Sequence, residues 1–333
     1  MSDVLSTVHI ERMAEAFLAR DVFEAKQIAL DLLDAGVGIG EVMTHLIAPA
    51  QARIGDRWHL NEASVADEHA ATAVADAVVS VLTTITPPAA KGPHVVVACA
   101  EGEWHLLAAR LLAETLRGDG FRISFLGGSM PAAHLARFLE TTAPDVLAVS
   151  ASTPLALEGV LAFVHVAHSA GVPVIAGGRA LGSDDHRAHV LGADLWAPDA
   201  LAASKSLQQP LPRVLNAPTA DTGTAMEISL HAPALVAAAM SEFEMRFPAV
   251  LEYTPEQRAR TREDFGYIIQ FAQAALLTRD AGLFDDFLDW MTQLLVARRV
   301  PAEALTLALD TLTAVTGIRE LEQLLRNART ANR

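Results

Sequence analysis

A glutamate and a histidine two residues apart form the pairing in this sequence best suited to metal chemistry. Glu103 and His105 lie in the stretch Glu101–Ala109 (EGEWHLLAA), together with Trp104. An imidazole is a strong donor to late transition metals, and a carboxylate at this spacing can hydrogen-bond the ring and tune its basicity. The pair predicts a metal-ligating histidine supported by a carboxylate.

The elements around this pair alternate between strand and helix patterns. We expect strands at 94–100, 122–126, 145–150, 173–176 and 194–197, separated by helices at 106–117, 131–141, 155–170 and 183–191. Such alternation predicts a flavodoxin-like, doubly wound sheet of five parallel strands over residues 94–206. Glu103 and His105 would then lie at the carboxyl edge of the sheet, where ligands of such folds bind.

Small residues follow three of the other expected strands. They are Gly127-Gly128 before Ser129, Ser150 and Ser152 around an alanine, and Gly177-Gly178. Residues without bulky side chains let a ligand approach the backbone closely. Together they predict a ligand-binding edge, although glycine after a strand is also common turn chemistry.

Helical patterns precede and follow this region. We expect a four-helix bundle over residues 1–84, with helices at 4–19, 22–34, 39–58 and 64–84 and N-caps at Asp21 and Ser64. Proline-rich segments at 85–93 and 208–224 read as linkers. An all-helical domain is expected over 225–333, with first-turn prolines at Pro233, Pro255 and Pro301.

Composition narrows the function classes. Of the 333 residues 51% are hydrophobic and the net charge is −15, without a basic cluster, which argues against a nucleic-acid surface. The single cysteine, Cys99, excludes an intramolecular disulfide and suits a reducing cytosol. No signal segment or membrane-spanning run is apparent, so we expect a soluble, cytoplasmic protein.

The spacing from Glu103 onward resembles the cobalamin-binding domain family. Its pattern is an acid, a histidine two residues later, a small residue three further on, then Ser-x-small or apolar, then Gly-Gly. Here forty-one residues separate Ala108 from Ser150. The resemblance implies that His105 is the lower axial cobalt ligand and Glu103 its acid, and that Ser150 and Ser152 contact the buried nucleotide tail. Gly177-Gly178 would give the tail room. Glu replaces the family's Asp and Ala108 its glycine.

A second resemblance lies in the bundle. Trp58, nine further residues and Glu68-His69 match the helical cap of light-sensing cobalamin photoreceptors. This implies that Trp58 and Glu68 embrace the upper, adenosyl face of the cofactor. His59 would reach cobalt after light breaks the cobalt–carbon bond, with His69 behind it. The alternative is an ordinary amphipathic bundle with Trp58 in its core.

The C-terminal region resembles that of photocobilins, in which a cobalamin module precedes a helical biliverdin-binding domain. Arg262, Tyr267 and Trp290 would contact a bilin, held non-covalently because this region has no cysteine. The alternative is a solvated row of arginines with Trp290 in a core.

These features favour a light sensor, not an enzyme, that binds adenosylcobalamin and biliverdin and responds by changing its homo-oligomeric state. Related transcription factors carry a helix-turn-helix domain ahead of the bundle. This sequence begins with the bundle, so we expect signalling by association and no direct DNA binding. Two alternatives stay open: a corrinoid carrier protein of a methyltransferase system, and a flavodoxin-like sensor without a corrin.

Overall fold

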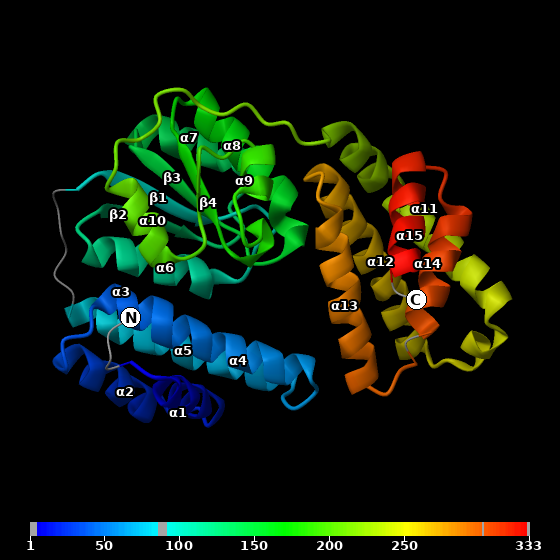
Figure 1. The fold of residues 1–333 in the computed structure, drawn as a ribbon, viewed down its shortest axis with the longest axis horizontal. Coiled ribbons are helices and arrows are strands. Elements are labelled where there is room, and N and C mark those ends of the chain that lie inside the picture. The colour runs from blue at the N-terminus through cyan, green and yellow to red at the C-terminus, as the bar shows by residue number, and fades with distance from the viewer. Residues whose placement is uncertain (1–4, 86–91, 302, 332–333) are drawn as a thin grey trace. The chain divides into compact units, whose positions relative to one another are not determined.

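The structure is a computed structural model that describes residues 5–85, 92–301 and 303–331. The chain forms two compact units, Met1–Thr219 and Ala220–Arg333. The first contains a helical bundle and a parallel sheet, and the second is helical (Figure 1). None of the described helices is long and apolar enough to cross a membrane.

The bundle is built from helices close to those predicted. Helices α1 (Thr7–Leu18) and α2 (Val22–Asp34) are followed by one long helix, and α5 (Val65–Ile85) closes the bundle. The long helix comprises α3 (Ile39–Val42), a π-helical turn (Met43–Ile47) and α4 (Ala48–His59) without interruption. Asp21 caps α2 by accepting from the Glu24 amide at 2.9 Å, as predicted. The linker expected at 85–93 falls mostly outside the described residues.

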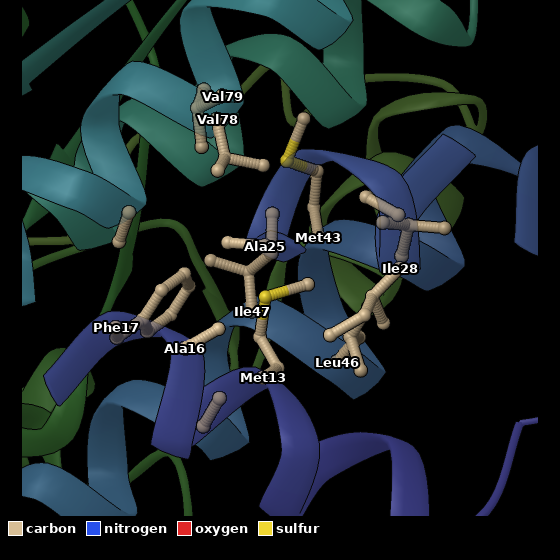
Figure 2. Close-up of a cluster of buried hydrophobic side chains, with 14 of the residues drawn as sticks. Met13, Ala16, Phe17, Ala25, Ile28, Met43, Leu46, Ile47, Val78 and Val79 are labelled. Carbon is tan, nitrogen blue, oxygen red and sulfur yellow. The ribbon is translucent and has the colours of Figure 1, made fainter. Parts of the chain in front are cut away.

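The bundle's core is aliphatic and methionine-rich. Met13 and Phe17 of α1, Ile28 of α2, Met43 and Ile47 of the π-helical turn are buried together (Figure 2). Two residues of α6 from the sheet domain, Leu107 and Leu111, belong to the same buried cluster. Because burial of apolar surface drives folding, bundle and sheet are held together by a shared core.

The sheet has the predicted five parallel strands. They are ordered β2-β1-β3-β4-β5, which is the flavodoxin-like order. Their bounds are β1 His94–Cys99, β2 Arg122–Gly127, β3 Val146–Ser150, β4 Val174–Gly177 and β5 Leu195–Ala197. The order reverses direction between β1 and β3, so a crevice for ligands is expected outside the carboxyl ends of these two strands.

Helices cover both faces of the sheet. Helices α6 (Leu106–Gly118) and α10 (Ala200–Leu207) pack on one face, and α7 (Ala132–Thr142) and α8 (Leu157–Ser169) lie on the other (Figure 1). The short α9 (His186–Val190) precedes β5, so the helix expected at 183–191 is shorter than predicted. Helix α6 also joins the sheet to the bundle through Arg110, which pairs with Asp76 of α5 at 3.6 Å.

The segment expected as a linker at 208–224 is partly anchored. The Asn216 amide donates to Asp194 Oδ1 at 2.8 Å, and the Thr219 amide donates to the Val190 carbonyl at 2.9 Å. The next unit begins with the Asp221 amide, which donates to the Leu277 carbonyl. Ala220 alone separates these two anchors.

Within the described residues the second unit consists of five α-helices and a 3₁₀-helix at Pro248–Glu252 between the first two. The α-helices are α11 (Thr222–Arg246), α12 (Pro255–Leu277), α13 (Ala281–Ala297), α14 (Glu303–Val315) and α15 (Arg319–Ala331). Pro255 is the first residue of α12, as predicted. The placement of Pro233 in a first turn is wrong, because α11 begins eleven residues earlier at Thr222 and contains Pro233 in its interior. Asp221 starts it by accepting from the Thr224 amide, a capping signal stronger than the proline.

Candidate functional site

His105 lies at the carboxyl edge of the sheet, between the end of β1 and α6. It is the residue before the first turn of α6, and its side chain is 64% exposed. Glu103 beside it is 1% exposed. The sequence thus places an accessible imidazole over a buried carboxylate, at the point where the strand order reverses.

Both oxygens of the Glu103 carboxylate take part in hydrogen bonds. Oε1 lies 2.6 Å from His105 Nδ1 and accepts from the His105 amide at 2.8 Å. Oε2 accepts from the amides of Ser152 at 2.6 Å and Thr153 at 3.1 Å. Glu103 therefore ties the loop after β1 to the loop after β3, forty-nine residues away.

These contacts decide the protonation state of the pair. Although burial raises the pKa of Glu103, the hydrogen bonds from His105 and Ser152 outweigh it and lower the pKa from 4.5 to about 2. An ionised carboxylate only accepts, so the proton between the two side chains belongs to His105 Nδ1. In the neutral ring the lone pair is then on Nε2, which is the arrangement that a metal ligand requires.

The pKa of His105 is raised, chiefly by the hydrogen bond to Glu103 and against the effect of burial. The carboxylate of Glu68, from the bundle, also raises it, and the guanidinium of Arg179 lowers it. Arg179 directly follows Gly178 after β4. The sequence motif did not single out Arg179, and only its position after a strand end could have indicated it.

Backbone geometry accounts for the glycines after β2 and β4. Gly127 has a positive φ of 79°, and a Cβ on Gly128 would lie 3.3 Å from the Glu103 carbonyl. A Cβ on Gly177 would meet the Ala197 carbonyl at 2.7 Å, and one on Gly178 the Ala151 carbonyl at 2.3 Å. Ser150, which ends β3, is buried, whereas Ser152 is half-buried. These residues form one row along the carboxyl edge.

The bundle residues lie where α4 ends and α5 begins. Trp58 and His59 occupy the last turn of α4, and both are partly buried. Glu68 Oε1 accepts from Thr72 Oγ1 at 3.0 Å and from Gln51 Nε2 at 3.3 Å, and Oε2 lies 2.8 Å from His69 Nδ1. His69 is 74% exposed. Because the charge of Glu68 raises the pKa of His105, the bundle residues and the sheet residues of the first unit interact electrostatically.

The residues expected to contact a bilin are spread over two helices of the second unit. Tyr267 on α12 and Trp290 on α13 are partly exposed, and Phe271 stacks on Phe287 at 3.9 Å between these helices. Phe287 lies 6.3 Å from the Trp290 ring. Arg262 is exposed and lies roughly 140° around α12 from Tyr267, so these two side chains do not share a face.

Comparison with known proteins gives two family matches. Residues 93–205 match the family model described as B12 binding domain, and residues 9–83 match a second model with the same description. The chain is 29% identical over 179 residues to the HTH-type transcriptional repressor CarH of Myxococcus xanthus, covering 52% of this chain and 59% of that protein. The fold is similar to that of the monomethylamine corrinoid protein of Methanosarcina barkeri, with a TM-score of 0.52 and 19% identity over 61% of this chain and 99% of that one.

Proposed function

We propose that this chain, which carries B12 binding domains at residues 9–83 and 93–205, is a light sensor that binds adenosylcobalamin between the bundle and the sheet. The observation that carries the proposal is the buried Glu103 carboxylate, which holds the proton on His105 Nδ1 and leaves Nε2 to ligate cobalt. A single accessible imidazole suits a metal whose other ligands come from a macrocycle.

Each site residue then has a distinct role. His105 would hold the metal from its lower face, and Ser150, Ser152, Gly177 and Gly178 would border the space for the nucleotide tail. On the upper face Trp58 provides a flat apolar wall, and Glu68 accepts hydrogen bonds from ribose hydroxyls. When bound, adenosylcobalamin supplies a cobalt–carbon bond that visible light cleaves. His59, next to Trp58, would supply the second nitrogen ligand once the upper group is gone.

We expect the protein to retain adenosylcobalamin through gel filtration in the dark and to change its absorption spectrum and elution volume under green light. His59→Ala should leave the dark spectrum unchanged and alter only the light product, because His59 acts after the upper group has left. His69→Ala is the control on the same surface and should alter neither.

Two outcomes would redirect the assignment. A retained corrin whose photolysis leaves the elution volume unchanged would favour the alternative of a corrinoid carrier protein, which shares the lower histidine but has no use for Trp58 and Glu68. No retained corrin in the dark would reject the cobalamin site.

A bilin in the second unit is a separate part of the proposal. It is supported by the partly exposed rings of Tyr267 and Trp290 and by the Phe271–Phe287 stack between their helices. We expect added biliverdin to give a red absorption band that survives gel filtration, and Trp290→Ala to weaken it about tenfold through lost aromatic contact. Tyr253→Phe, on another part of the unit, is the control. A band that is absent or insensitive to Trp290→Ala would remove this part and leave the cobalamin proposal intact.

A further inference from the structure

Gln51 on α4 has one side-chain atom whose hydrogen-bonding capacity is unused. Its Nε2 donates to Thr72 Oγ1 at 2.6 Å and to Glu68 Oε1 at 3.3 Å. Thr72 Oγ1 in turn donates to Glu68 Oε1 at 3.0 Å. Because both neighbours accept from Gln51, the amide nitrogen must face them and Oε1 must point elsewhere. Among the described residues, buried Oε1 has no hydrogen-bond donor.

A buried acceptor without a donor is rare in folded proteins, because the group has lost water and gained nothing in return. Such atoms mark a strained site, a bound water or a ligand contact. Gln51 also fixes Glu68, which the proposed function places at the upper face of the cofactor. Its unused oxygen therefore lies beside the proposed ligand site.

Gly55 provides room on the same side of α4. It lies four residues after Gln51 and three before Trp58, so the three residues are neighbours on one helix face. A Cβ added at Gly55 meets nothing within 4 Å. Glycine inside a helix is unfavourable relative to alanine, and no neighbour excludes the alanine methyl group. The helix thus gives up local stability and keeps a bare stretch of backbone between Gln51 and Trp58.

We propose that Gln51 and Gly55 extend the purine nucleoside site of Trp58 and Glu68, with Gln51 as its specificity-determining residue. Gln51 Oε1 accepts a hydrogen bond from an N–H or O–H group of the nucleoside, and the base lies over the backbone of Gly55. The inference rests on the proposed function, since the nucleoside is the upper ligand of adenosylcobalamin. Oε1 is buried, so binding must displace a neighbouring side chain.

The test is equilibrium binding in the dark of adenosylcobalamin and methylcobalamin, which share the corrin and differ in the upper group. Gly55→Ala should weaken adenosylcobalamin about tenfold and leave methylcobalamin within about twofold, because a methyl group does not reach the subsite. The same variant should raise the melting temperature of the cofactor-free protein by about 2 °C, since alanine favours the helix. Gln51→Met should also weaken only adenosylcobalamin, by about five- to tenfold.

Gly266→Ala is the matched control. It makes the same helical substitution in α12 of the second unit, where the nearest atom to the new Cβ is Gln270 Nε2 at 3.9 Å. It should affect neither cobalamin. Equal weakening of both cobalamins by Gly55→Ala and Gln51→Met, or no effect on either, would overturn the subsite while leaving the sensor proposal standing. A wild-type protein that binds neither cobalamin would overturn both.

Discussion

Replacing Glu103 by Gln should destabilise the cofactor-free first unit by about 3 kcal/mol near pH 6. The carboxylate accepts four hydrogen bonds, two from His105 and two from the amides of Ser152 and Thr153. A glutamine has one accepting end, so the donors on one side lose their acceptor, at about 1–3 kcal/mol for each donor that is shielded from water. The lowered pKa gives a similar figure, since the shift from 4.5 to about 2 corresponds to about 3 kcal/mol.

The pH dependence of this difference has a defined sign. The folded pKa of Glu103 is below its unfolded value, so its stabilisation is complete above pH 4.5 and is lost as the pH falls towards about 2. The pKa of His105 is raised in the folded state. Its contribution to the free energy of unfolding is therefore complete below pH 6.5 and declines as the pH rises through the folded pKa. The difference in the free energy of unfolding between wild type and Glu103→Gln should therefore be largest between about pH 4.5 and pH 6.5. Urea unfolding followed by circular dichroism from pH 3 to 8 measures it.

His105→Ala separates ligation from stability. This variant leaves Oε2 of Glu103 bonded to both amides, so the first unit should lose about 1 kcal/mol. Bound cobalamin should then lack the spectrum of a nitrogen-ligated lower face. Glu103→Gln keeps the imidazole but not its orientation, and should lower cobalamin affinity about 10- to 100-fold. A Glu103→Gln protein as stable as wild type at pH 6 would mean that the carboxylate does not join the two loops.

Local patterns in the sequence were sufficient for the sheet. Four strands are short, mainly apolar runs, and β2 alternates polar and apolar residues from Arg122 to Phe125. The predicted bounds differ from those of β1 to β5 by one residue at most at each end. The spacing of Glu103 and His105 also predicted their hydrogen bond, because residues two apart after a strand are neighbours whatever the rest of the fold does.

Contacts between residues far apart in the sequence could not be predicted from local patterns. The bond from Ser152 to Glu103 spans forty-nine residues, and the link from Gln51 to Glu68 joins two helices. Neither leaves a periodic signal. Pro233 misled for a related reason: proline is tolerated in a helix interior when packing holds the helix together, and α11 packs along both α12 and α14.

Gly178→Ala should destabilise the first unit by about 4 kcal/mol. Gly178 has φ 101° and ψ 163°, a conformation that is essentially restricted to glycine and costs other residues about 1–3 kcal/mol. The new Cβ would also lie 2.3 Å from the Ala151 carbonyl oxygen, a backbone atom that cannot rotate away. Overpacking of this kind adds about 1–3 kcal/mol. Urea unfolding of the cofactor-free protein measures the loss.

Gly171→Ala is the matched control, because Gly171 also has a positive φ, 71°, but a Cβ there meets nothing within 4 Å. It should cost only about 1 kcal/mol. The difference between the two variants measures the contact with Ala151 together with the stricter backbone conformation at Gly178. The contact with Ala151 leads to the lower ligand. Ala151 donates to the Gly177 carbonyl and accepts from the Ala180 amide, and the next residue is Ser152, whose amide holds Glu103. Gly178→Ala should therefore displace the Ser152 amide and reduce the added cost of Glu103→Gln in the double variant. Strictly additive losses would show that the Gly-Gly turn and the Glu103–His105 pair are independent features of this edge.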